Sequence, residues 1–237
     1  MAMRTAYHRA VVKLIFLCAR RAGLDRARYA AHLLERHAPL ALRHHASLRR
    51  YVLNLVDEGG DAAESIDSVN ALHYDAFADF ELRNYDSAEG ERIVTEDHAR
   101  FLGSASGYLT EESVQLEGGT GVAPGARTPG TKWICALRRS ARLSRDRFFA
   151  ALESDLVPEL LAAQALASRV AVDRVERKLY PGGPEIDAFL ETSFPDAARA
   201  PLHPFDSFDC GMTLRGRLAR LTDATTAWRV SEYVQRV

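Results

Sequence analysis

The sequence predicts an α+β protein built from two copies of one βαββαβ unit, which close together into a barrel within a single chain. Three observations support this prediction: an ungapped internal repeat, a segment rich in Gly and Pro between the copies, and strand and helix patterns that alternate within each copy. A chain of 237 residues, 47% of them hydrophobic, has enough apolar material to bury such a core.

The repeat appears when the sequence is shifted against itself by 119 positions, which aligns residues 13–42 with residues 132–161. Eleven of those thirty pairs are identical, against roughly three expected by chance in a chain so rich in Ala, Arg and Leu. With gaps, the match continues by pairing Asp75–Phe77 with Asp206–Phe208 and Ser113–Gln115 with Tyr233–Gln235. We interpret the pattern as a duplication.

The two copies are separated by residues 118–130, whose glycines and prolines disfavour both helix and sheet. We therefore predict a first repeat at 1–117 that holds the candidate site, a linker at 118–130, and a second, diverged repeat at 131–237.

The first strand and helix of each copy have clear signals. The apolar run Val11–Ala19 is typical of a strand covered on both faces. Asp25, and Ser144 at the aligned position, can each accept a backbone N–H at the start of the helix that follows.

The remaining patterns complete the βαββαβ order. In the first copy they predict strands at 50–56 and 74–83 around a loop at 57–70, a helix at 87–102 that Gly90 and Thr95 could break, and a last strand at 112–117. In the second copy, the middle section is expected to be longer, around 181–204, and the corresponding helix to be shorter, at 218–226. This order is the split pattern of a ferredoxin-like sheet, and the face without helices is expected to pack against the sister copy.

Composition and motifs exclude several function classes. The 31 basic and 32 acidic residues nearly cancel, which argues against nucleic acid as a partner. The cysteines have no metal-ligand spacing and the longest apolar run is too short to span a bilayer, so we expect a reduced, cytoplasmic protein without a membrane partner. No nucleotide-binding, serine-hydrolase or zincin motif is present, and we predict no cofactor and no metal.

A series of short segments resembles the EthD-like family of the dimeric α+β barrel proteins. A strand that ends in a basic pair and Gly-Leu leads to a helix that ends in Glu-Arg-His-Ala-Pro-Leu. The further segments, in order, are Arg50–Asn54, Tyr74–Phe80 and Glu96–Leu102. The resemblance implies a barrel with a small apolar cleft between sheet and helices. It also implies that the relatives of this protein include decarboxylases, cyclases, lactone isomerases, cofactor-free monooxygenases and, more distantly, haem enzymes.

His37 is the strongest candidate for a catalytic residue. It shares an inward helical face with Tyr29 and Leu33, whereas the second copy has Leu156 at the aligned position. A neutral imidazole there could move a proton near pH 7 or ligate haem, and the alternative is a buried histidine bonded to a carbonyl or near the helix end. Because Val170 also replaces Tyr51, we assign any chemistry to the first copy.

The other candidates lie on predicted strands. Tyr51 could hold a substrate oxygen, and Asn54, three residues on, points to the opposite face. Asp79, inside the predicted strand 74–83, could orient His37, although a salt bridge would explain it equally well. His98 and His73 are weaker candidates, because solvated histidines are ordinary near the ends of elements, and the adjacent His44 and His45 cannot easily ligate one metal together. The other residues expected to line the cleft are Phe16, Phe77, His98 and Phe101.

These candidates predict a cofactor-free lyase or isomerase of secondary metabolism, acting on a small aromatic or polyketide-like acid. His37 would be the general acid or base, Asp79 would tune it and Tyr51 would hold an oxygen. A non-catalytic protein that binds a hydrophobic ligand is the alternative, and a haem-binding oxidoreductase has less support. The expected partner is a small molecule, and the chain is expected to be a monomer or a homodimer.

Overall fold

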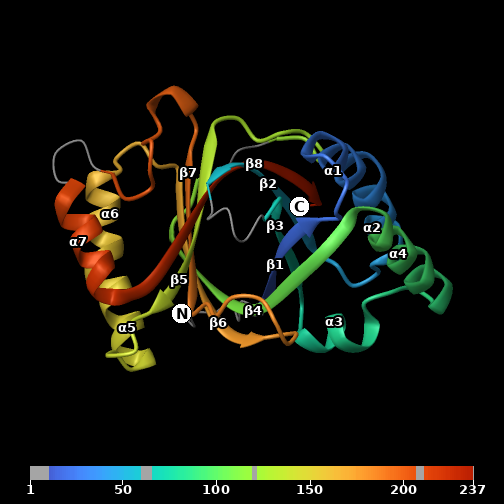
Figure 1. Cartoon of the computed structure of the whole chain (residues 1–237), viewed down its shortest axis with the longest axis horizontal. Helices are drawn as coiled ribbons and strands as arrows, with labels where there is room; N and C mark the ends of the chain where they lie inside the picture. Colours follow the sequence, from blue (N-terminus) through green and yellow to red (C-terminus); the bar gives the residue numbers. More distant parts are fainter. Residues whose placement is uncertain (1–10, 60–65, 119–121, 207–210, 237) are drawn as a thin grey trace, which may run out of the picture.

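The computed structural model describes residues 11–59, 66–118, 122–206 and 211–236. Eight antiparallel strands form one closed barrel in the order β1-β3-β2-β8-β5-β7-β6-β4 (Figure 1). The first half supplies β1 (Val12–Arg20), β2 (Arg50–Gly59), β3 (Ser68–Tyr74) and β4 (Leu102–Leu116). The second half supplies β5 (Thr131–Arg139), β6 (Arg169–Lys178), β7 (Ala188–Phe194) and β8 (Thr222–Arg236).

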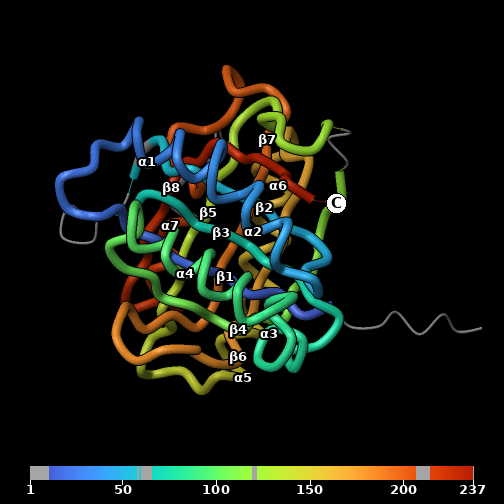
Figure 2. Tube along the Cα trace, turned by 90° about the vertical axis from the view of Figure 1, so that its right-hand side faces the viewer, coloured from blue at the N-terminus to red at the C-terminus, as the bar shows by residue number. Residues whose placement is uncertain are grey.

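The helices cover the outside of the barrel in two groups, one for each half. In the first group, α1 (Arg26–His32) continues through the π-helical turn η1 (Leu33–His37) into α2 (Ala38–His44), and α3 (Phe77–Arg83) and α4 (Ala88–Phe101) follow. In the second, α5 (Arg145–Ala151), η2 (Leu152–Leu156) and α6 (Val157–Ala163) are followed by the short η3 (Ala197–Arg199) and α7 (Gly211–Leu221). The groups lie on opposite sides of the barrel in Figure 1, and Figure 2 looks onto the first.

The predicted duplication and α+β barrel are confirmed. Every element from β1 to β2 recurs exactly 119 residues later, so that Val12–Arg20 corresponds to Thr131–Arg139. One residue is added after that, and β4 recurs as β8 at a spacing of 120. Each half has the strand order of a ferredoxin-like sheet, and the halves join where β2 pairs with β8 and β4 with β6.

The strand alternation separates two kinds of core. Side chains that point into the barrel include Ile15, Val69, Phe189 and Trp228, which pack together at its centre. Side chains on the outer face of each sheet pack against the helices of the same half, as Leu14, Leu53 and Tyr29 do in the first repeat. Two separate helix-facing layers therefore lie on either side of one shared barrel interior.

A network of buried charges crosses the barrel interior between the repeats. The Nζ atom of Lys13 lies 2.8 Å from Glu112, 2.9 Å from Asp173 and 2.9 Å from Glu191. Lys132, its repeat partner, lies 2.8 Å from the other carboxylate oxygen of Glu191. The second repeat thus supplies two of the three carboxylates that surround Lys13 of the first repeat.

The predicted helix starts are confirmed. The Asp25 carboxylate accepts a hydrogen bond from the N–H of Arg28, and the Ser144 hydroxyl accepts one from the N–H of Arg147. The strand predicted at 50–56 is also present, although β2 extends to Gly59.

The strand predicted at 74–83 is wrong. β3 begins earlier, at Ser68, inside the predicted loop, and the chain turns after Tyr74 into the helix α3. The turn is stabilised locally, because the Asp79 carboxylate accepts a hydrogen bond from the N–H of Ala76 at the start of α3. The alternating pattern that resembled a strand belongs to the first turn of a helix.

Three further boundaries differ from prediction. α4 is one unbroken helix, and β4 follows it directly from Leu102 rather than from residue 112. In the second repeat, α7 ends at Leu221 and the rest of the predicted helix is the start of β8.

Phe208, Cys210 and residues 119–121 of the predicted linker lie outside the described residues. No helix in the described part of the chain is long and apolar enough to cross a membrane.

Candidate functional site

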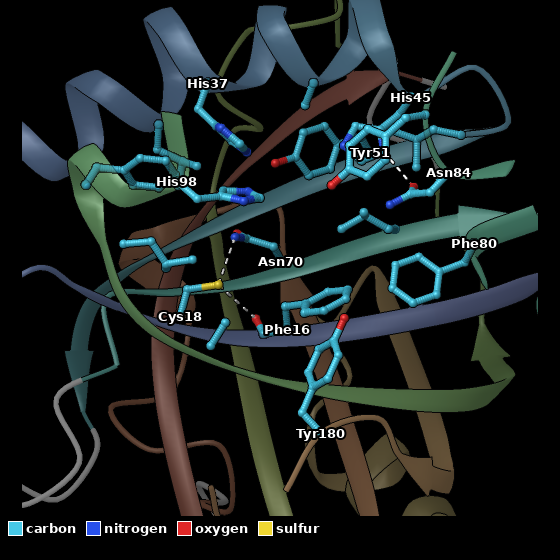
Figure 3. Close-up of a pocket in the computed structure, with 18 residues that line it drawn as sticks. Phe16, Cys18, His37, His45, Tyr51, Asn70, Phe80, Asn84, His98 and Tyr180 are labelled. Atoms are coloured by element: carbon cyan, nitrogen blue, oxygen red, sulfur yellow. Dashed lines mark hydrogen bonds between the residues drawn. The ribbon is translucent and has the colours of Figure 1, made fainter. Parts of the chain in front are cut away.

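A cavity of about 260 Å³ lies between the sheet of the first repeat and its helices (Figure 3). The helices supply its roof, the strands β1, β2, β3 and β4 supply its floor, and Tyr180 of the second repeat also lines it. Its polar lining consists of Cys18, His37, His45, Tyr51, Asn70, Asn84, Tyr85, His98 and Tyr180. The rest of the lining is apolar and includes Phe16, Leu33, Leu48, Leu72, Phe80 and Phe101.

His37 points from the roof into this cavity, as Figure 3 shows. His37 is only 5% exposed, and its Nδ1 atom lies 3.0 Å from the Oδ2 atom of Asp97 on α4. Burial, helped by the nearby His98 ring, lowers the pKa of His37 to about 4, despite the opposing effect of Asp97. The imidazole is therefore neutral at pH 7.

Asp97 contacts a second imidazole with its other oxygen. Its Oδ1 atom lies 2.9 Å from the Nε2 atom of His32, at the end of α1. Burial alone would raise the pKa of Asp97, but the hydrogen bonds from His37 and His32 hold it below its usual value. One buried, ionised carboxylate thus links two histidines, one facing the cavity and one with an 18% exposed side chain.

Aromatic rings hold the histidines in place. The His37 ring centroid lies 4.7 Å from that of His98 and 4.9 Å from that of Phe101. The His32 ring stacks on Phe101 at 4.9 Å with an interplanar angle of 25°. The side chains at the end of α1, in the π-helical turn and in the last turns of α4 therefore pack against one another.

At the other end of the roof, His45 lies beside the loop that follows α3. Its Nδ1 atom is 2.6 Å from the Oδ1 atom of Asn84, which also accepts a hydrogen bond from the Tyr74 hydroxyl. Burial lowers the pKa of His45 as well. Its ring is 4.8 Å from that of Tyr85, so this end is both aromatic and polar.

The floor carries two further polar groups. The amide nitrogen of Asn70 on β3 donates to the Sγ atom of Cys18 at 3.6 Å, while its buried Oδ1 atom has no hydrogen-bond partner among the described residues. Burial raises the pKa of Cys18 to about 12, so this thiol is not a thiolate nucleophile at neutral pH. Tyr51 on β2 is 4% exposed, and burial raises the pKa of its phenol.

Five of the eight predicted site residues line the cavity: Phe16, His37, Tyr51, His98 and Phe101. The prediction that Tyr51 and Asn54 point to opposite faces of β2 is confirmed, because Asn54 faces away and donates to the carbonyl of Val69 at 2.7 Å. The expectation that Asn54 binds substrate in this cavity is therefore wrong.

The structure also places Asp79 and Phe77 outside the cavity lining. The Asp79 carboxylate caps the start of α3 and forms an ion pair with Arg83. The Phe77 ring is covered by the guanidinium of Arg177 at 4.5 Å. The predicted carboxylate partner of His37 exists, but it is Asp97 rather than Asp79, because residues 77–83 form a helix and not a strand.

Sequence reasoning missed Asp97 and two polar residues of the floor, Cys18 and Asn70, although the repeat contains a signal for the floor residues. At the spacing of 120, Leu190 corresponds to Asn70 and Leu218 to His98. At the spacing of 119, Leu137 corresponds to Cys18 and Leu156 to His37. All four leucines are buried in the helix-facing core of the second repeat. At these four positions, a polar residue in the first repeat that corresponds to a buried leucine in the second repeat lines the cavity.

The alternative that His37 ligates haem can be judged on the size of the cavity. A carboxylate on the second nitrogen is typical of metal-bound histidines, so the donor itself is suitable. However, a cavity of 150 Å³ holds benzene, so about 260 Å³ is too small to enclose haem, a macrocycle of four pyrrole rings. Haem does not fit this cavity. Among the described side chains, no cluster of three or more His, Cys, Asp or Glu is placed to hold a metal ion.

Comparisons with known proteins agree with this description. The model of the EthD domain matches residues 21–105, which include the helices and strands that carry His37, Tyr51 and Asn70. No curated protein matches the sequence.

Several solved structures have the same fold over almost the whole chain. An anthrone oxidase-like protein has a TM-score of 0.61 at 12% identity, with 95% of this chain and 94% of that chain covered. A protein provisionally described as a monooxygenase from Fusobacterium nucleatum has a TM-score of 0.58 at 8% identity, with coverages of 96% and 93%. A chlorite dismutase variant from Candidatus Nitrospira defluvii has a TM-score of 0.50 at 9% identity, with coverages of 94% and 92%. At these identities the likeness is one of fold alone.

Proposed function

The chain carries an EthD domain in one half of a tandem α+β barrel, and on this premise we propose that it is an enzyme in which His37 acts as general base. We infer a cofactor-free lyase or isomerase that removes a proton from a small aromatic or polyketide-like acid. One observation carries the proposal: a buried, neutral imidazole faces a ligand-sized cavity while its other nitrogen contacts a carboxylate.

The low basicity of His37 narrows the substrate class. A group with a pKa of about 4 is unprotonated at pH 7 but is a weak base, so the proton that it removes must be acidic. Protons next to a carbonyl group are only weakly acidic, so His37 can remove one only if the site stabilises the enolate oxygen by a hydrogen bond. When Nε2 of His37 takes such a proton, the electron pair stays on the substrate as an enolate, and Asp97 stabilises the imidazolium.

The cavity supports an aromatic substrate with polar substituents. A cavity of 150 Å³ holds benzene, so about 260 Å³ suits a ligand of roughly two rings. Phe16, Phe80 and Phe101 offer ring contacts, and the unpartnered oxygen of Asn70 could accept a hydrogen bond from a substrate hydroxyl. The Tyr51 phenol, held protonated by burial, could donate one to a substrate oxygen.

Hydrogen–deuterium exchange tests the proposal before the full reaction is known. The probes are a dihydroxybenzoic acid and a dihydroxynaphthoic acid, whose one and two rings match the size of the cavity. Each is incubated with the protein in D₂O, and deuterium uptake at carbon is followed by mass spectrometry. We expect exchange of at least one probe to be accelerated.

The first prediction concerns His37→Leu. Because the second repeat buries Leu156 at the corresponding position, this variant should fold, and exchange should fall by roughly 10²–10⁴-fold. His44→Gln is the matched control, since His44 faces Asp86 rather than the cavity. Unchanged exchange in His37→Leu would remove His37 from the mechanism. If the probes raise the melting temperature of both proteins without any exchange, the cavity belongs to a non-catalytic binding protein.

A further inference from the structure

We propose that Asp97 is a positioning residue, which keeps the proton of neutral His37 on Nδ1 and leaves the Nε2 lone pair facing the cavity. The inference rests on the proposed function for its catalytic meaning, but the proton position can be measured without any substrate. Neither Asp97 nor His32 is among the residues that line the cavity.

The first step follows from the charge of the carboxylate. An ionised carboxylate has no proton to donate, so each of its two histidine contacts requires a proton on the histidine nitrogen. His37 must therefore carry a proton on Nδ1, which lies 3.0 Å from Oδ2, and His32 must carry one on Nε2, which lies 2.9 Å from Oδ1.

The second step concerns the opposite nitrogen of His37. With Nδ1 protonated, Nε2 of the neutral ring is an acceptor, and it makes no hydrogen bond to any described residue. In Figure 3 the ring points from the helix into the cavity, above Asn70. The hydrogen bond to Asp97 therefore requires the tautomer of His37 with its proton on Nδ1. In this tautomer the unprotonated Nε2 faces the cavity and can act as a base.

The third step explains why this arrangement is rigid. Asp97 lies on α4, His37 ends the π-helical turn and His32 ends α1, so one carboxylate joins three segments. The rings of His32 and His37 also pack against Phe101, one turn after Asp97 on α4. His32 contributes as a second donor that holds the carboxylate in place.

The experiment is ¹⁵N NMR on the full-length protein labelled at histidine, recorded at pH 7. The His37 signal is assigned by its loss in His37→Leu. We expect a protonated Nδ1 and an unprotonated Nε2 for His37 in the wild-type protein. A wild-type His37 that carries its proton on Nε2 would overturn the proposal, whatever the activity.

Asp97→Asn provides the second prediction. A carboxamide of the same shape can accept from only one imidazole and donates to the other, so His32 and His37 can no longer both direct a proton at residue 97. One of the two tautomers should switch, and the midpoint of His37 protonation should move to lower pH because the negative charge is lost. Exchange should fall by about 10²–10⁴-fold, since the imidazolium is no longer stabilised by a carboxylate.

His32→Gln is the matched variant, because its amide can still donate to the carboxylate. It should leave the His37 proton on Nδ1 and lower exchange by less than about tenfold. Full exchange activity in Asp97→Asn would overturn the positioning role. The expected tautomer in a protein that exchanges none of the probes would instead support the assignment of the proton and contradict the proposed function.

Discussion

The buried histidines make the stability of this protein dependent on pH. Burial lowers the pKa of His37 to about 4 and that of His73, which also faces Lys13 and Arg50, to about 3. An unfolded histidine titrates near 6.5, so between these values the unfolded chain binds more protons than the folded one. The free energy of unfolding should therefore fall as the pH drops from about 6.5 to 4.

The third prediction tests the share of His37 in this effect. In His37→Leu the urea midpoint should fall less steeply between pH 6.5 and 4 than in the wild-type protein, because one buried titrating group has been removed. His98, His45 and Asp97 face the same ring and remain in both proteins. Equal slopes in the two proteins would show that His37 is not protonated more easily on unfolding.

At single positions, the sequence predicts which residue faces the cavity better than it predicts which residues contact that one. The substitution of His37 by Leu156 in the repeat correctly singled out a residue that lines a cavity. For Asp79 the sequence leaves two roles open, orienting His37 or forming a salt bridge, and the structure shows the salt bridge, to Arg83. Asp97 contacts His37 across 60 residues, and no local pattern reports a contact of that range.

Among the elements, those with an explicit start signal were the most predictable. Asp25 and Ser144 mark helices that begin within one residue of the predicted place. β3 was missed because its Asn and Ser side chains weaken the strand pattern, and those same polar residues reach the cavity or its surroundings. Where the sequence departs from an ideal strand, it does so at the candidate site.

The strands β1, β4, β6 and β7 meet at the buried ammonium group of Lys13, which provides the fourth prediction. Lys13→Met should lower the free energy of unfolding by about 3–5 kcal/mol, because Glu112, Asp173 and Glu191 lose a shared counter-charge in a buried place. Urea denaturation at pH 7 measures the change.

Lys178→Met is the control for that experiment. Lys178 also forms an ion pair, at 2.9 Å from Glu185, but the Glu185 side chain is 77% exposed. Its loss should change stability by no more than about 1 kcal/mol. Equal effects of the two substitutions would contradict a special role for the buried network.

For the whole molecule, the closed barrel leads to the fifth prediction. Each of the eight strands pairs with two neighbours, so the described sheet has no free edge that could pair with a second chain. We therefore expect a monomer, with a mass near 26.3 kDa by light scattering after size-exclusion chromatography. A mass twice as large at micromolar concentration would require an interface made by helices or loops.

The contacts of β8 with the first repeat also set an order of events during synthesis. Arg236 donates to the carbonyl of Leu48, which lines the cavity beside Tyr51, and β8 pairs along β2. The ribosome adds the 162 residues between Gly59 and Thr222 before β8 begins, which takes on the order of ten to thirty seconds. During that interval the edge of β2 that pairs with β8 has no partner strand, so we expect the barrel to close only after β8 has been made.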